Sequence, residues 1–180
     1  YLADDIRTGD ISTDSPEFAA AEKADQDRVA QLLNNKGKTP VDDFHRRLGR
    51  IMWNQCGMSR NEEGLKQAIA DIQALREEFE KDVCVPGRAD RYNPELDKAG
   101  RVSDLLELGE LMCKDALERN ESCGGHFREE YRTPEGEALR DDAGHAHVSA
   151  WAFTGVPSEA VHHKEELKFE NVELKTRSYK

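Results

Sequence analysis

The sequence predicts a mainly α chain: an antiparallel up-and-down bundle of three to four helices, followed by a small β/loop C-terminal segment. Apolar residues recur every three or four positions over most of residues 15–123. Short connections containing Pro, Gly or Asn separate these apolar stripes, which favours antiparallel neighbours. The helical period stops after Gly124 and Gly125, so the rest of the chain is expected to form short strands and turns.

The composition agrees with this fold class and excludes several functions. Charged residues make up 35% of the 180 residues and hydrophobic residues 37%, a balance typical of amphipathic helices with wet outer faces. The net charge of −11 argues against a nucleic-acid partner, because phosphate binding needs clustered Lys and Arg. No apolar run approaches the length of a membrane span, so we expect the chain itself to be soluble.

The first two helices are predicted from their starts and stripes. Ser15 is placed as the N-cap of the first helix, with Pro16 at its first position, and residues 34–37 end it. Its apolar face is thin, so we expect it on the surface of the bundle. Thr39 and Pro40 start the second helix in the same way. Its core-facing stripe consists of Val41, Phe44, Leu48, Ile51, Met52 and Cys56.

The third and fourth helices carry the main apolar seams. Residues 59–62 read S-R-N-E, an S-x-x-E capping box that starts the third helix, and an apolar stripe follows over residues 65–83. The fourth helix, residues 93–117, would be roughly 35–40 Å long at 1.5 Å per residue. Leu108 and Leu111 widen its apolar face, so we expect it to be covered on more than one side.

The C-terminal segment changes to turn and strand patterns. Residues 133–144 have turn and loop chemistry, and residues 147–154 (H-V-S-A-W-A-F-T) read as a strand. Residues 167–176 also alternate, but their apolar phase slips across residues 170–171. That slip predicts a bulged or bent strand.

The sequence supports no catalytic, cofactor-binding or metal-ligating residue. It contains no G-x-G-x-x-G, P-loop, H-E-x-x-H or G-x-S-x-G motif. Cys123, His126, His145 and His147 are of metal-ligand type, but their spacing differs from that of zinc sites. We therefore favour ordinary loop residues, with a metal-binding regulatory domain as a weaker alternative. The two histidines His162 and His163 lie in a polar stretch and are expected to be solvated.

Two further groups have structural interpretations. Charged residues gather just past the end of the fourth helix and predict a salt-bridge network in preference to a catalytic site; they are Arg119, Glu121, His126, Arg128, Glu129 and Glu130. The four cysteines are widely spaced and form no C-x-x-C motif, which favours reduced thiols; they are Cys56, Cys84, Cys113 and Cys123.

Residues 119–126, R-N-E-S-C-G-G-H, resemble the R-x-E-S-R-G-A-H signature of the succinate dehydrogenase/fumarate reductase flavoprotein subunits. The preceding L-E-L-G-E-L-M is similar to the long C-terminal helix of that family, and residues 51–65 resemble its helix-turn-helix. The terminal T-R-S-Y at 176–179 is similar to the family's R-S-Y/R-T-Y. These matches occur in the family's order from about Phe44 onward.

The signature departs from the family at two positions. Cys123 and Gly125 stand where the family has Arg and Ala, so the contacts of that arginine do not carry over. Glu121, Ser122, Gly124 and His126 match the motif. The motif is therefore interpreted as an architectural joint and not as a site.

The resemblance implies a parent oxidoreductase that holds a covalently attached FAD and interconverts succinate and fumarate. Electrons would pass to an iron–sulfur subunit and then to a quinone through a membrane cytochrome b anchor. The parent complex would then lie at the cytoplasmic side of the cell membrane. Residues 1–14 would be a lead-in from a preceding flavin-binding domain, 15–123 the helical bundle, and 124–180 a β/loop tail packing on the bundle.

The same resemblance implies that the FAD is bound upstream, so this chain would hold no cofactor and would be inert alone. Its partners would be the flavin-binding domain of the same chain and the iron–sulfur subunit. Surface left bare by the absent domain would favour self-association. The alternative is a free-standing helical protein-interaction module without catalytic activity.

Overall fold

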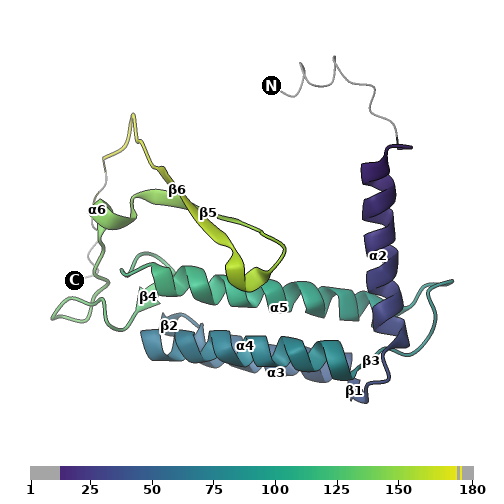
Figure 1. The fold of residues 1–180 in the computed structure, drawn as a ribbon. Helices are drawn as coiled ribbons and strands as arrows, with labels where there is room; N and C mark the ends of the chain where they lie inside the picture. The colour runs from purple at the N-terminus through teal and green to yellow at the C-terminus, as the bar shows by residue number, and fades with distance from the viewer. Residues whose placement is uncertain (1–12, 174, 176–180) are drawn as a thin grey trace.

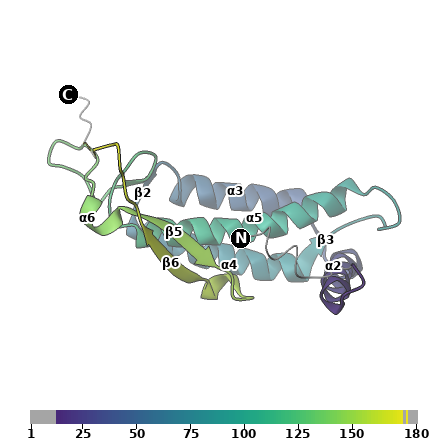
Figure 2. The ribbon, with the colours of Figure 1, turned by 90° about the horizontal axis from the view of Figure 1, so that it is seen from above.

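A computed structural model describes residues 13–173 and 175 of the chain. Three long helices lie side by side, namely α3 (Val41–Gln55), α4 (Glu62–Asp82) and α5 (Pro94–Glu118). The helix α4 runs antiparallel to its two neighbours, and the view from above shows α5 between α3 and α4 (Figures 1 and 2). The prediction of a mainly α, up-and-down fold is confirmed.

The apolar stripes of the three helices form one core. The rings of Phe44 and Phe79 meet edge to face with centroids 5.2 Å apart, which joins α3 to α4. A Cβ atom at Gly109 of α5 would lie 3.3 Å from the Met52 sulfur and 3.4 Å from Leu48 Cδ1. The lack of a side chain at this position therefore lets α5 approach α3 closely.

One ionised group lies inside the bundle, where the sequence pattern suggested only apolar contacts. Glu110 of α5 is fully buried, with its carboxylate 2.6 Å from Arg76 Nη1 and 2.9 Å from Lys114 Nζ. It also accepts a hydrogen bond of 2.9 Å from Gln73 Nε2. Because Arg76 and Gln73 belong to α4, these contacts fix the register of α5 against α4.

Short parallel strand pairs close both ends of the bundle (Figure 1). At one end β1 (Thr39–Pro40) pairs with β3 (Val83–Cys84), and at the other β2 (Ser59–Arg60) pairs with β4 (Phe127–Arg128). The second pair corrects the predicted capping box. Ser59 is in a strand, and Asn61 is the N-cap of α4, accepting a hydrogen bond of 2.8 Å from Gly64 N. The Ser59 hydroxyl donates a hydrogen bond of 2.8 Å to Glu129 instead of capping α4.

The first described helix, α2 (Pro16–Asn34), stands away from the bundle (Figure 1). It has no buried side chain, in keeping with its thin apolar face. Only its C-terminal part reaches the other helices: Leu32 and Leu33 pack against the core, and the Asn35 side chain donates a hydrogen bond of 3.0 Å to Glu80 O. The bundle itself therefore has three helices.

The C-terminal segment folds into a short helix, α6 (Asp142–His145), and a hairpin over α5. Strand β5 (His147–Ala152) pairs antiparallel with β6 (Val161–Glu166), and the 3₁₀ turn η1 (Pro157–Glu159) connects them. The predicted strand at 167–176 is wrong for its described residues, 167–173 and 175. His147 at the start of β5 already pairs with Glu166, so later residues have no strand opposite them.

The hairpin covers only part of the outer face of α5 (Figure 2). Leu105, Leu108 and Met112 are 41%, 53% and 57% exposed, so the expected cover on a second side is missing within the described chain. In residues 13–173 and 175 we find no helix with both the length and the apolar character that a membrane span requires.

Candidate functional site

The segment after α5 is organised by Arg128, whose side chain is 1% exposed. Its Nη1 donates hydrogen bonds to the carbonyl oxygens of Ala116 (2.9 Å) and Leu117 (3.1 Å). These carbonyls lie in the last turn of α5 and have no partner within the helix. A guanidinium there also suits the helix dipole. Arg128 therefore caps α5 from ten residues beyond its end.

Ser122 and Glu121 complete this joint, which we define as residues 119–130. Ser122 Oγ accepts from Arg128 N (2.8 Å) and donates to Arg128 O (3.1 Å). The buried Glu121 carboxylate accepts from Arg119 Nε and from Asp141 N, both at 2.8 Å. The predicted salt-bridge network is thus found. In it, Glu121 and Ser122 form hydrogen bonds with backbone groups and fix the path of the chain.

His126 closes a tight turn in the joint. The backbones of Cys123 and His126 exchange two hydrogen bonds, of 2.8 and 3.1 Å, and Gly124 has a φ of +60°. His126 Nε2 lies 2.9 Å from the Arg119 carbonyl oxygen, which can only accept, so this nitrogen carries the hydrogen. Burial lowers the pKa of His126 and favours the neutral ring.

The joint is also bound to the turn between α3 and α4. The Glu129 carboxylate accepts from Ser59 Oγ (2.8 Å) and Asn61 Nδ2 (3.0 Å), and these hydrogen bonds lower its pKa. Glu130 accepts from the backbone N–H of Glu62 (2.5 Å), at the start of α4, where the helix dipole favours an anion. The two glutamates therefore have structural roles here.

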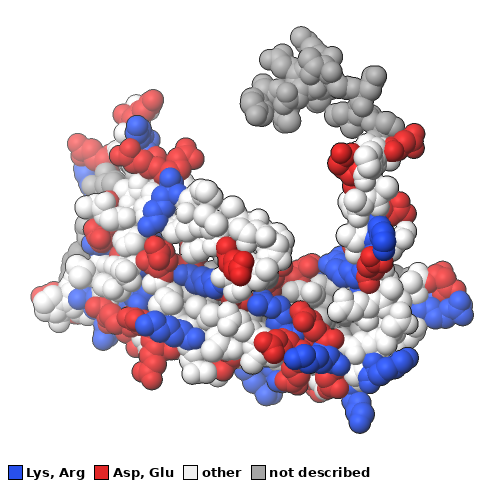
Figure 3. Space-filling model, viewed as in Figure 1, with Lys and Arg blue, Asp and Glu red and all other residues white. Residues whose placement is uncertain are grey.

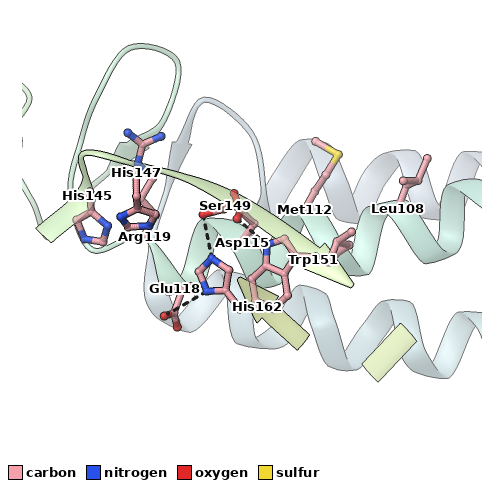
Figure 4. Close-up of a pocket in the computed structure, with 11 residues that line it drawn as sticks. Leu108, Met112, Asp115, Glu118, Arg119, His145, His147, Ser149, Trp151 and His162 are labelled. Carbon is pink, nitrogen blue, oxygen red and sulfur yellow. Dashed lines mark hydrogen bonds and ion pairs between the residues drawn. The ribbon is translucent and has the colours of Figure 1, made fainter. Parts of the chain in front are cut away.

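A separate cavity of about 420 Å³ lies between α5 and the hairpin (Figure 4). Trp151 on β5 donates a hydrogen bond of 2.8 Å from Nε1 to Asp115 of α5. His162 on β6 stacks on Trp151 at 4.4 Å, and its Nε2 lies 2.9 Å from Ser149 Oγ. Its Nδ1 lies 3.7 Å from the Glu118 carboxylate. These contacts hold the hairpin against the helix.

His162 corrects the expectation of a solvated pair at 162–163. Its side chain is only 14% exposed, whereas His163 points away and is exposed. Residues 161–166, V-H-H-K-E-E, show no apolar alternation, so the sequence gives no sign that His162 faces inward. A strand that packs on Trp151 and Glu118 can use a histidine for that face.

The four metal-ligand candidates do not converge. Cys123 and His126 lie in the joint, whereas His145 and His147 line the cavity beside α5. Across residues 13–173 and 175, no group of three or more His, Cys, Asp or Glu side chains is arranged to hold a metal ion. The weaker hypothesis of a metal-binding regulatory domain therefore finds no ligand set in the described part of the chain.

The described residues do not fit a flavin either. A dinucleotide site needs a strand, a glycine-rich turn and a helix N-terminus facing the pyrophosphate. Helix α3 begins instead after a two-residue strand, and α4 and α5 begin after an asparagine cap, without such a turn. The cavity at the hairpin has Asp115 and Glu118 in its lining beside Arg119 and three histidines, and these two carboxylates would repel a pyrophosphate.

The model of the family described as "Fumarate reductase flavoprotein C-term" matches residues 45–179, three quarters of the chain. The chain belongs to this family. It is a C-terminal domain of the fumarate reductase/succinate dehydrogenase flavoprotein type, which confirms the resemblance stated from the signature at 119–126. The signature residues Glu121, Ser122 and His126 all hold the joint together in this member of the family.

Curated relatives agree with this assignment. The chain is 31% identical over 131 residues to the fumarate reductase flavoprotein subunit of Helicobacter pylori, covering 73% of this chain and 18% of that subunit. It is 27% identical over 104 residues to the succinate dehydrogenase flavoprotein subunit of Rickettsia bellii, covering 58% of this chain and 17% of the relative. The chain therefore spans less than a fifth of the length of either relative.

Solved structures share the fold. A mutant E. coli quinol fumarate reductase superposes with a TM-score of 0.75 at 21% identity, covering 92% of this chain and 27% of the other. The apo Mycobacterium smegmatis Sdh1 complex gives a TM-score of 0.74 at 24% identity, covering 94% of this chain and 27% of the other. The arrangement of α2, the three-helix bundle and the hairpin is thus found in larger proteins.

Proposed function

We propose that this chain is the docking and rigidifying domain of a flavoenzyme that interconverts succinate and fumarate. The observation that supports this most strongly is the joint, whose family signature residues serve backbone geometry and leave no reactive group free for substrate. A domain of this kind stabilises the enzyme by packing and carries no chemistry itself.

The outer face of α5 supports a docking role. Leu105, Leu108 and Met112 form an exposed apolar strip that the hairpin does not cover. In Figure 3 the space above this helix, between α2 and the hairpin, is open. The relatives are more than five times as long as the segment they share with this chain, so the proposed occupant is the flavin-binding domain of the same polypeptide.

The parent enzyme would hold covalent FAD in that upstream domain, with residues 1–14 leading in, 15–123 forming the bundle and 124–180 the tail. It would pass electrons to an iron–sulfur subunit and, through a membrane cytochrome b anchor, to a quinone, as a peripheral complex at the cytoplasmic side of the membrane. The similar structures, a quinol fumarate reductase and an Sdh1 complex, support the proposal that the parent belongs to such a complex.

The proposal is tested in two steps. The chain alone should neither bind FAD in a calorimetric titration nor turn over succinate, because it has no dinucleotide-binding turn. In the longer flavoprotein, Leu108→Glu with Met112→Glu should reduce flavin content and succinate turnover together, because a charged strip cannot be buried against the flavin domain.

A control variant outside the strip, Met58→Glu, changes an 81% exposed residue in the turn between α3 and β2 and should leave both quantities unchanged. Stoichiometric FAD binding by the chain alone would contradict the docking role. Full flavin content and activity of the α5 double variant would show that the flavin-binding domain does not dock on this strip.

A further inference from the structure

The outer face of α3 carries two arginines and a tryptophan, all exposed to solvent. The helix turns by about 100° per residue, so Arg46, Arg50 and Trp53 lie on the side opposite to the buried Phe44 and Leu48. The Trp53 side chain is 84% exposed, which is unusual for the largest apolar side chain. In Figure 2, α3 runs along the edge of the bundle, away from the hairpin.

The two arginines are free cations in an acidic chain. Within residues 13–173 and 175, Arg46 and Arg50 make no hydrogen bond, ion pair or ring contact. The carboxylates of the first turn of α3 serve other cations. Asp42 lies 3.3 Å from a lysine of α5, and Asp43 acts on Arg47. The net charge of the chain is −11, so two adjacent arginines without a carboxylate are an exception on its surface.

Gly49 opens a gap between these side chains. It follows Arg46 by three positions and precedes Trp53 by four, so the three residues are neighbours on the helix surface. A Cβ atom at Gly49 would meet no atom within 4 Å. The ridge of side chains along α3 is therefore interrupted beside the indole, and a side chain of a second helix fits into such an opening.

We propose that the α3 face, defined as residues 46, 49, 50 and 53, docks an acidic helix of a partner polypeptide. Two carboxylates four residues apart on that helix pair with Arg46 and Arg50, whose guanidinium groups present donors in a planar fork. An apolar side chain between the carboxylates lies over Gly49 and against Trp53. Tryptophan and arginine are the side chains that most often dominate the binding energy of an interface.

The charge distribution favours this occupant over two others. A second copy of the chain also carries −11, so the two copies repel each other at long range. An anionic membrane repels the chain for the same reason, and basic membrane sites use about four to eight Lys or Arg where this face has two. The inference goes beyond the proposed function, because the α3 face and the strip on α5 consist of different residues.

Titration with a helical peptide tests the α3 face. The peptide, about 20 residues long, places two glutamates four residues apart around a leucine. We expect it to shift the NMR signals of the Gly49 amide and the Trp53 indole of the ¹⁵N-labelled chain. Its affinity should fall roughly tenfold or more in the double variant Arg46→Gln with Arg50→Gln, and also in Trp53→Ala. A peptide with glutamine in place of both glutamates should lose affinity similarly.

The control is the double variant Arg88→Gln with Arg91→Gln. It removes two exposed arginines of the loop before α5, both beside Asp90, and should bind the acidic peptide as the wild type does. Circular dichroism checks that each variant is folded. Failure of the Gly49 and Trp53 signals to shift, or equal affinity for the glutamine peptide, would overturn the proposal. So would wild-type affinity in the Arg46 and Arg50 double variant.

Cross-linking identifies the occupant in the longer flavoprotein. A benzophenone amino acid placed at position 53 is irradiated in the cells that make the protein, and the cross-linked peptides are sequenced by mass spectrometry. We expect an acidic segment of a separate polypeptide. A cross-link to the flavin-binding domain, to a second copy or to lipid would contradict the proposal and leave the docking role of the α5 strip untouched.

Discussion

Arg128 shows how much of the joint depends on one side chain. Its guanidinium satisfies two carbonyls at the end of α5 and pairs with Glu130 at 3.1 Å, while its backbone bonds to Ser122. Removing it takes this donor from two carbonyl groups at the end of α5 and leaves Glu130 with its hydrogen bond from Glu62 N. Each carbonyl group then has to be hydrated or left unsatisfied inside the fold.

We expect Arg128→Ala to lower the free energy of unfolding by about 2–4 kcal/mol, measured by urea denaturation. Arg128→Lys should recover only a fraction of the lost stability, because an ammonium group cannot reproduce the planar set of donors of the guanidinium. The control, Arg132→Ala, changes an exposed residue that makes one bond to Glu129 O and should shift stability by less than about 0.5 kcal/mol. Equal losses in the two alanine variants would show that burial of Arg128 is not the cause.

His126 should give the joint a pH dependence. Burial lowers its pKa from the ordinary value of 6.5 in the folded chain, so the unfolded chain binds more protons below that value. The stability it contributes is therefore present above about pH 6.5 and is lost as the pH falls from there towards the folded-state pKa.

His126→Gln should remove that component, because glutamine can donate to the Arg119 carbonyl but does not titrate here. Wild type and variant are compared by urea midpoints between pH 7.5 and 5. The difference between the urea midpoints of the two proteins should change as the pH falls from 7.5 to 5. If the urea midpoints of both proteins shift equally with pH, the His126 ring has the same pKa in the folded and the unfolded chain.

At the scale of the helices, the packing of α5 on α3 depends on Gly109. A side chain there would meet the Met52 sulfur and Leu48 at 3.3–3.4 Å. Gly109→Leu should therefore force α5 outward and cost about 1–3 kcal/mol through overpacking. Gly49→Ala on α3 is the matched control, since no atom lies within 4 Å of the new Cβ. Gly49→Ala should raise the free energy of unfolding by about 0.5–1 kcal/mol. Both variants are compared with the wild type by thermal denaturation.

The hairpin is a second element with a defined anchor. Its Trp151 donates to Asp115 and stacks on His162, while the outer face of both strands is exposed. Trp151→Phe keeps a ring but loses the hydrogen bond to a carboxylate, so amides of β5 should exchange roughly tenfold faster with deuterium. Asp115→Asn keeps an acceptor for Trp151, so the β5 amides of this variant should exchange nearly as slowly as those of the wild type. Unchanged exchange in Trp151→Phe would place the anchor elsewhere.

For the whole molecule, the exposed strip on α5 predicts self-association. Leu105, Leu108 and Met112 lie on one helix face, so two copies can bury these side chains against each other. We expect sedimentation to show dimers that increase with concentration. A variant with serine at all three positions should remain monomeric, whereas Met58→Ser, outside the strip, should behave as wild type. A strictly monomeric wild-type chain at high concentration would disprove this expectation.

Much of the fold could be predicted from the sequence, because helix periodicity is local. The stripes at 41–56, 65–83 and 93–117 are α3, α4 and α5 to within a few residues, and the turn chemistry between them implied antiparallel packing. The signature at 119–126 also identified the family, because a run of specific residues is preserved in the order of the chain.

The tertiary structure alone decided which long-range partners these residues have. Ser59 belongs to a strand because β4 lies beside it, and residues 161–166 form β6 because β5, from His147 to Ala152, lies opposite them. Likewise, Arg128 caps a helix that ended ten residues earlier, and Trp151 of the hairpin donates a hydrogen bond to Asp115 of α5. Local patterns record each residue's own preference, whereas these contacts depend on which segments the folded chain brings together.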